Sequence, residues 1–437
     1  MEINMNLNEK EKIKAKAILV GIVTDKAISD ETEKSLDELA LLLDTAGGET
    51  FAKVIQNKST LDPRTLIGSG KVAEIRELCE NNEIGLVIFD MELSPAQIRN
   101  LEEDIGNGVS VIDRSMLILD IFALHATSGE GKLQVELAQL KYTAPRLIGK
   151  GTELSRLGGG IGTRGPGESK LESDRRHLKR RIVALEGELE ALAATRRTMR
   201  AQRDRSGLKK VAIVGYTNAG KSTLLNYLTD AGILAEDKLF ATLDPTTRKF
   251  ELPGGETVLL TDTVGFIKKL PHHLVNAFKS TLDEAVSADI IMILTDASDP
   301  EHESQLECTE QTLAELGAQD KPTLYVFNKC DKIDGELFID RTPERQHTVC
   351  ISAATGAGCD ELAAKLEQMI HEGKSRVTFK IPNAEQRALN VLYKEATVED
   401  VEYGDEYVTV TATVDAKVRG MLKKYDTEAK TLTEEDY

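Results

Sequence analysis

Eight consecutive residues near the middle of the chain form the pattern G-x-x-x-x-G-K-[ST], which binds nucleotide phosphates. They are Gly215, Tyr216, Thr217, Asn218, Ala219, Gly220, Lys221 and Ser222. The apolar run KKVAIV precedes them and a helical pattern follows, which is the strand–loop–helix context that the motif requires. Backbone N–H groups of such a loop wrap the phosphates, and the helix N-terminus adds its positive dipole end. We therefore predict that Lys221 neutralises the β- and γ-phosphates and that Ser222 binds Mg²⁺ through its hydroxyl.

A second motif stands at the end of the predicted strand TVLLT. Its residues are Asp262, Thr263, Val264 and Gly265. We expect the carboxylate of Asp262 to reach the Mg²⁺ shell, directly or through water, and the N–H of Gly265 to face the γ-phosphate. The spacing from the first motif therefore predicts a triphosphate site at the ends of two strands.

Two segments, each following a further predicted strand, indicate which base the bound nucleotide carries. They consist of Asn328, Lys329, Cys330 and Asp331, and of Ser352, Ala353 and Ala354. The carboxylate of Asp331 can accept hydrogen bonds from N1–H and the 2-amino group of guanine, a donor pair that adenine lacks. Asn328 can tie the base to the phosphate loop, the stem of Lys329 can cover the ring, and a backbone N–H of 352–354 can face guanine O6. Cys330 occupies a variable position. We therefore predict a protein that binds GTP and hydrolyses it to GDP and phosphate.

Hydrolysis also needs a threonine that closes on Mg²⁺ and the γ-phosphate. Thr242, Thr246 and Thr247 all lie in the right interval, and their chemistry alone does not choose among them. Phe266 stands where many GTPases carry a glutamine that orients water. Because a phenyl ring cannot polarise water, we expect slow unaided hydrolysis and a site completed by a partner surface or by another switch residue.

Three longer segments, together with these motifs, resemble the HflX family of GTPases. They are LILDIFALHATSGEGKLQVELAQLKYTAPRL (117–147), LGGGIGTRGPGESKLESDRR (157–176) and FATLDPTTR (240–248). The resemblance covers about residues 15–372 and is weaker in the tail. It implies a ribosome-associated GTPase that binds the large ribosomal subunit and its rRNA. It further implies that the protein can separate stalled or idle ribosomes into subunits.

The resemblance also implies roles for single residues. It makes Thr242 the switch threonine, so that Thr242 and Ser222 bind the metal, and we assign catalysis to Lys221, Thr242 and Gly265. It adds a group of nucleotide-binding residues between the first two motifs. These are Phe240, Ala241, Thr242, Leu243 and Asp244. Phe266 fits the family too, which is hydrophobic at that position.

The elements that must position these residues predict an α/β multidomain protein with four parts. The first is an N-terminal α/β domain at 1–128, with strands expected at 17–24, 50–57, 84–90 and 109–112 and helices at 30–45, 70–81 and 94–104. The others are a helical hairpin with a glycine-rich loop at 129–206, a P-loop GTPase domain with a mostly parallel sheet at 207–373, and a small C-terminal α+β module at 374–437. In that module we expect strands at 375–382 and 406–414 and a helix near 384–397.

The predicted hairpin is the one basic region of an acidic chain. Leucines at coiled-coil spacing run through both of its helices, the first of which should end near Pro145, and the loop at 158–167 has six glycines in ten positions. The whole chain carries −18, yet residues 141–210 hold 18 Lys+Arg and 8 Asp+Glu, so +10 is concentrated there and −28 is left elsewhere. We predict RNA contact through Arg164 at the loop tip and through Arg175 and Arg176. The alternative is a solvated helix face and a flexible turn.

Composition excludes several other classes of protein. Aromatic residues make up 4% and Trp is absent, which argues against a protein that binds single strands by stacking bases on aromatic rings. Five cysteines without a CxxC pair argue against a disulfide framework or a zinc ribbon. We expect no signal peptide and no membrane span, a cytoplasmic location and a monomer. There are two alternatives to ribosome splitting: a nucleotide-gated anti-association or assembly factor in which hydrolysis serves only release, and an RNA-stimulated ATPase. The guanine motif disfavours the ATPase.

Overall fold

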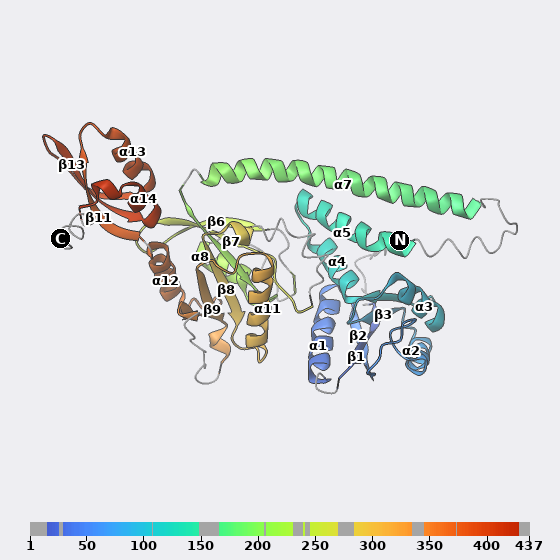
Figure 1. Cartoon of the computed structure of the whole chain (residues 1–437). Helices are drawn as coiled ribbons and strands as arrows, with labels where there is room; N and C mark the ends of the chain where they lie inside the picture. The colour runs from blue at the N-terminus through green and yellow to red at the C-terminus, as the bar shows by residue number, and fades with distance from the viewer. Residues whose placement is uncertain are drawn as a thin grey trace, which may run out of the picture. The chain divides into compact units, whose positions relative to one another are not determined.

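A computed structural model describes residues 15–25, 29–106, 108–147, 166–204, 207–229, 239–240, 245–269, 284–333, 345–372 and 374–427 (Figure 1). Its internal contacts divide the chain into two compact units. The first consists of Met1–Arg200, Lys210–Phe250 and Leu259–Cys359, and the second of Ala201–Lys209, Glu251–Val258 and Asp360–Tyr437.

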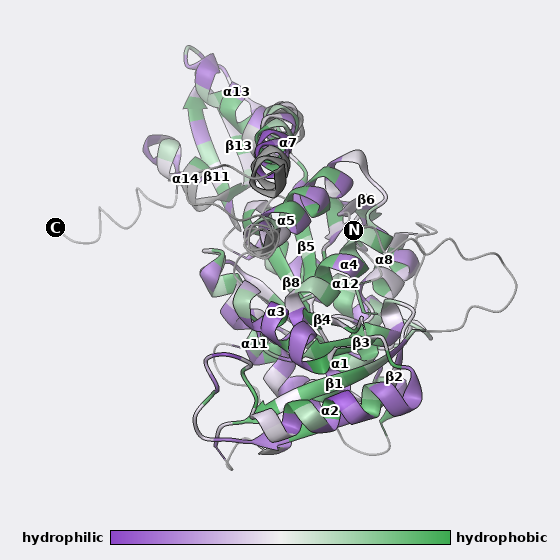
Figure 2. Ribbon diagram, turned by 90° about the vertical axis from the view of Figure 1, so that its right-hand side faces the viewer, coloured by the Kyte–Doolittle hydropathy of each residue, from purple (hydrophilic) through white to green (hydrophobic). Residues whose placement is uncertain are grey.

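The chain begins with a parallel four-stranded sheet in the order β2-β1-β3-β4. Its strands are β1 (Lys16–Val23), β2 (Glu49–Asn57), β3 (Leu86–Phe89) and β4 (Ser110–Asp113), and its helices are α1 (Ser29–Thr45), α2 (Ser69–Asn82) and α3 (Pro95–Ile105). Alternate residues of the central strand β1 enter different cores: Leu19 packs with α1, whereas Val20 packs with α2 and α3. In Figure 2 the strands are mostly hydrophobic and α2 carries hydrophilic residues. Helices therefore cover both faces of the sheet, as a parallel sheet requires.

Helix α4 (Arg114–His125) follows β4 directly and was not predicted. The carboxylate of Asp113 caps it by accepting a hydrogen bond from the Met116 N–H at 3.0 Å. Two longer helices then form the hairpin, α5 (Gly129–Leu147) and α7 (Pro166–Asp204). Glu130 pairs with Arg196 and Lys141 pairs with Glu186, so the helices run antiparallel. Helix α5 ends two residues after the proline at which we expected its end.

A six-stranded sheet in the order β10-β9-β8-β5-β7-β6 carries the predicted motifs. The strands are β5 (Lys209–Gly215), β6 (Thr246–Glu251), β7 (Thr257–Asp262), β8 (Ile290–Asp296), β9 (Thr323–Asn328) and β10 (Thr348–Cys350), with helices α8 (Lys221–Thr229) and α11 (His302–Glu315). The pairs β5–β8, β8–β9 and β9–β10 are parallel. Four of these strands end at Gly215, Asp262, Asp296 and Asn328. Ligands of open α/β sheets bind at the carboxyl ends of the strands, so this edge is where a nucleotide site belongs.

The C-terminal part is an antiparallel sheet in the order β11-β13-β12. It contains β11 (Lys374–Pro382), β12 (Thr397–Tyr403) and β13 (Tyr407–Asp415), with helices α12 (Cys359–His371), α13 (Gln386–Glu395) and α14 (Ala416–Met421). Phe379 and Val410 from the sheet and Leu392 from α13 are fully buried together. The predicted multidomain α/β fold class is confirmed, and β12 was not predicted. Within the described ranges, no helix is long and apolar enough to cross a membrane.

Candidate nucleotide-binding site

The phosphate-binding loop between β5 and α8 folds the lysine back onto its own backbone. The ammonium group of Lys221 donates to the carbonyl of Gly215 at 3.1 Å and to that of Tyr216 at 2.8 Å, and the residue is 7% exposed. Burial lowers the pKa of Lys221 to about 8, and the nearby charge of Asp262 opposes this shift. The buried hydroxyl of Thr217 has no hydrogen-bond partner among the described residues. The loop therefore holds a charged donor and a hydroxyl donor where phosphate oxygens are expected.

Ser222 and Asp262 bring two oxygen ligands together beside this loop. The hydroxyl of Ser222 donates to the carboxylate of Asp262 at 2.7 Å, and Asp262 is fully buried. Mg²⁺ prefers such hard oxygens and takes only one or two protein ligands beside water and phosphates, so this pair fits a magnesium ion. Within the described residues, no three His, Cys, Asp or Glu side chains gather where they could hold a metal ion. Residues 241–244, which include Thr242, lie outside the described residues.

The segment 262–269, which we call switch II, lies directly against the phosphate loop. A Cβ on Gly265 would lie 2.8 Å from the Cα of Thr217 and 3.1 Å from Nζ of Lys221, so only glycine fits there. The Phe266 N–H donates to the Gly215 carbonyl at 3.0 Å, and its carbonyl accepts from the Thr217 N–H at 2.8 Å. The ring of Phe266 is 1% exposed and belongs to the core, and an apolar ring there cannot polarise a water molecule.

Asn328 connects the phosphate loop to the predicted base site. Its amide nitrogen donates to the Ala219 carbonyl at 2.8 Å, and its amide oxygen accepts from the Ala353 N–H at 2.9 Å. Gly220 has φ +94°, and a Cβ there would lie 2.3 Å from the Asn328 nitrogen. The close approach of the two segments therefore requires glycine at this position.

The remaining base-site residues follow the strand ends. Asp331 is exposed, and the Lys329 ammonium pairs with the carboxylate of Asp296 at 2.7 Å. Asp296 was not predicted as a site residue, although it ends the apolar run IIMILTD as Asp262 ends TVLLTD. Burial raises the pKa of Cys330 to about 11, with Cys350 adding to the shift, so this thiol is a weak nucleophile.

The structure thus gathers the phosphate and base motifs at one sheet edge, and the roles of the single residues stay predictions. Ser352 and Ala353 are buried and Ala354 is exposed. Phe240 is 2% exposed, and its ring meets that of Phe122. Arg175 and Arg176 are exposed on α7, whereas Arg164 lies outside the described residues.

The fold and the site together define a P-loop GTPase. Three family models cover most of the chain: "GTP-binding GTPase N-terminal" at residues 33–123, "GTP-binding GTPase Middle Region" at 125–203 and "50S ribosome-binding GTPase" at 210–329. The chain belongs to the HflX family and is a GTP-hydrolysing enzyme.

Its relatives extend over nearly the whole chain. It is 49% identical to GTPase HflX of Lacrimispora saccharolytica, over 95% of this chain and 97% of that one. It is 43% identical to GTPase HflX of Escherichia coli (strain K12), over 88% of this chain and 89% of that one. A solved structure of a GTP-binding protein from Sulfolobus solfataricus in complex with GDP is 27% identical, over 82% of this chain and 99% of that one, with a TM-score of 0.42.

Proposed function

We propose that this GTPase binds the large ribosomal subunit through its basic hairpin and that its GTP-bound form separates stalled or idle ribosomes into subunits. In this proposal the chain acts as a cytoplasmic monomer, and Mg²⁺ is held by Ser222 and Thr242 beside the phosphates. The metal would neutralise phosphate charge. The chain's own residues bind and orient: Lys221 donates to the phosphates, and Asp331 selects guanine.

The observation that carries the proposal is the distribution of charge on α7. Four of its cations are exposed within about two turns: Arg175, Arg176, Lys179 and Arg180. The next residue, Arg181, joins the two helices: it forms two hydrogen bonds to the carboxylate of Glu136 on α5, at 2.7 and 2.8 Å. The exposed group therefore presents positive charge to a partner, on a chain that is strongly acidic elsewhere. A polyanion such as rRNA matches this group.

Sedimentation of ribosomes with the protein tests binding and splitting together. The gradients are run with GTP, GDP or a non-hydrolysable GTP analogue. We expect co-sedimentation with the large subunit in both triphosphate samples and separated subunits at the expense of whole ribosomes. If GDP supports the same separation, or if no nucleotide supports it, the proposal is wrong. If the protein only keeps separated subunits apart, the anti-association alternative replaces it.

A charge-reversal pair tests whether the exposed group makes the contact. Changing Arg175 and Arg176 to Glu should weaken co-sedimentation at least tenfold and reduce its salt dependence, because each lost phosphate contact lowers the slope of affinity against salt by about one. GTP affinity should stay unchanged. The matched control reverses Lys16 and Arg76, two exposed cations of the N-terminal part, and so changes net charge equally. Equal weakening by both pairs would show that total charge, rather than this group, governs binding.

Hydrolysis provides a second test of the partner. Because the ring at position 266 is buried and apolar, we expect slow single-turnover hydrolysis by the protein alone and a marked rise when large subunits are added. Equal rates with and without subunits would contradict the proposed stimulation without affecting the GTPase assignment.

A further inference from the structure

Both backbone polar groups of Lys268, in switch II, are held by hydrogen bonds that lead to the N-terminal part of the chain. The Lys268 N–H donates to the hydroxyl of Tyr216 at 2.7 Å, and this hydroxyl in turn donates to the carboxylate of Glu38 on α1. The Lys268 carbonyl accepts from the guanidinium of Arg114, at the start of α4, at 3.1 Å. Arg114 also pairs with Glu38, which closes the set. We call these four residues, Glu38, Arg114, Tyr216 and Lys268, the switch II clamp.

Arg114 is the buried centre of the clamp, whereas the side chains of Glu38 and Lys268 are 14% and 34% exposed. Arg114 is 2% exposed and also pairs with Asp90 at 2.9 Å. The carboxylates of Glu38 and Asp90 keep the pKa of Arg114 above its ordinary value, although burial alone would lower it. The next switch II residue extends the contact: the Lys269 ammonium bonds to Asp90 at 2.6 Å and to the Ser35 hydroxyl at 2.8 Å. Buried pairs of this kind are costly to break because each leaves a charge unpaired.

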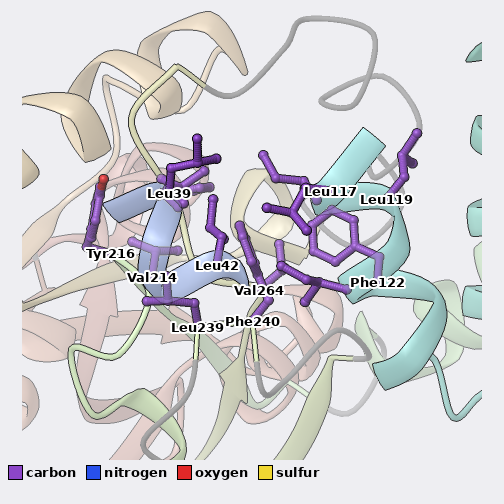
Figure 3. Close-up of a cluster of buried hydrophobic side chains, with 14 of the residues drawn as sticks. Leu39, Leu42, Leu117, Leu119, Phe122, Val214, Tyr216, Leu239, Phe240 and Val264 are labelled. Carbon is purple, nitrogen blue, oxygen red and sulfur yellow. The ribbon is translucent and has the colours of Figure 1, made fainter. Parts of the chain in front are cut away.

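Switch I, the segment 240–248, has its own contact with α4. The rings of Phe240 and Phe122 meet edge to face with their centroids 4.7 Å apart, and both side chains are at most 2% exposed. Figure 3 shows these two rings together, in a cluster that also contains Leu39 of α1 and Val264 of switch II. The N-terminal part of the chain therefore contacts both segments that must respond to the γ-phosphate.

We propose that the switch II clamp makes the N-terminal part of the chain a determinant of nucleotide preference: Glu38 and Arg114 act as positioning residues that hold switch II where it favours a triphosphate over a diphosphate. The clamp holds Lys268 three residues after Gly265, whose backbone lies beside the Lys221 ammonium. In this proposal, a γ-phosphate bound to that ammonium accepts a hydrogen bond from the Gly265 N–H while the clamp keeps switch II beside the phosphate loop. A diphosphate has no group at that position and gains nothing from the clamp.

The coupling is reciprocal by thermodynamic linkage. If the clamp strengthens triphosphate binding, a bound triphosphate strengthens the clamp by the same factor. Movement of switch II away from the phosphate loop has to break the two hydrogen bonds of Phe266. The proposal rests on GTP binding and is independent of ribosome splitting.

The test compares two Glu→Gln variants of the full-length protein. Glu38→Gln removes the charge that pairs with Arg114 in the clamp. The matched control is Glu310→Gln, because Glu310 makes the same two kinds of contact as Glu38. Its carboxylate accepts a hydrogen bond from the Tyr325 hydroxyl at 3.0 Å and pairs with Arg345 at 3.2 Å. Affinities for GDP and for a non-hydrolysable GTP analogue are measured by fluorescent nucleotide titration. Hydrogen exchange at the Lys268 amide is followed in parallel.

We expect Glu38→Gln to lower the ratio of analogue to GDP affinity by about fivefold and to speed exchange at the Lys268 amide, while the control changes neither. If Glu38→Gln does not fold, Lys269→Met serves instead, because the Lys269 side chain is 53% exposed and the buried Asp90 keeps its pair with Arg114 when the ammonium is removed. It should lower the same ratio. An unchanged ratio overturns the proposal, and a raised ratio also overturns it by showing that the clamp holds the diphosphate form.

Discussion

The buried lysine of the phosphate loop should make nucleotide affinity depend on pH near neutrality. In the nucleotide-free protein, burial lowers the pKa of Lys221 from 10.5 to about 8, against the opposing charge of Asp262. Such a shift corresponds to a cost of about 3 kcal/mol for the folded protein below pH 8, a cost relieved as the pH rises from about 8 towards 10.5. Phosphates remove the same cost by pairing with the ammonium group, so Lys221 is charged in the complex.

The sign and size of the effect follow from this linkage. Below about pH 7 the lysine is already charged in the free protein, and affinity should not change with pH. Above the pKa that Lys221 has in the nucleotide-free protein, nucleotide binding must take up a proton, so nucleotide affinity falls as the pH rises. With a free pKa of about 8, the charged fraction is about nine-tenths at pH 7.0 and about one-seventh at pH 8.8. The affinity for GDP should therefore fall about sixfold, or about 1 kcal/mol, over this range.

Titration with fluorescent GDP at pH 7.0, 7.9 and 8.8 and constant Mg²⁺ measures this fall. GMP is the control ligand, because it lacks the β-phosphate that Lys221 reaches and should lose less than about twofold. Constant GDP affinity up to pH 8.8 would refute the reasoning by showing that Lys221 stays charged in the free site. An equal fall for GMP would assign the pH dependence to the base site instead.

Three further substitutions, one of them with a control, test the base site and one partly buried carboxylate. Gly220→Ala should lower the melting temperature and GTP affinity together through the clash with the amide nitrogen described above, whereas Gly317→Ala, at φ +73° with no atom within 4 Å, should cost only about 1 kcal/mol of backbone strain. Asp331→Asn should weaken GTP binding about thirtyfold and improve binding of xanthosine triphosphate, whose 2-oxo group accepts from the new amide; unchanged GTP affinity would contradict the predicted base contact. Asp120 has its pKa raised by burial to about 6, opposed by a hydrogen bond from Gln139, so its stabilising contribution is full below pH 4 and is lost as the pH rises through 6. Asp120→Asn should therefore raise the melting temperature at pH 7.5 and leave it unchanged at pH 3.5; thermal unfolding at both values decides this.

Local residue patterns were sufficient to predict most strands, most helices and the nucleotide motifs. The phosphate loop is contiguous because backbone N–H groups and a helix start must surround one ligand, so its residues stand together in the chain. The buried runs of parallel strands are likewise contiguous and apolar, as in residues 17–24, which form β1. Where a ligand or a strand imposes a pattern on contiguous residues, that element can be predicted from the sequence alone.

Elements without a regular pattern were missed. Helix α4 has buried residues on nearly every side, such as Ile118, Leu119 and Phe122, so no amphipathic period marks it. Strand β12 is mostly exposed and acidic, with Glu399, Asp400 and Glu402, and so lacks the apolar alternation of an ordinary strand. The formation of α4 and of β12 depends on residues that are close in space but distant in the sequence, so no local pattern reveals either element.

The sequence by itself determined the nucleotide, the base preference and the family. Only the tertiary structure decided that the N-terminal part of the chain contacts the switches. In the sequence Tyr216 is one of four unconstrained letters of a phosphate loop, and Glu38 and Arg114 are ordinary charged residues of two helices. They become a set only when packing places α1 and α4 against switch II and buries their charges together. The energy of a buried charge pair depends on distance and burial, and these are properties of the folded chain rather than of residue spacing.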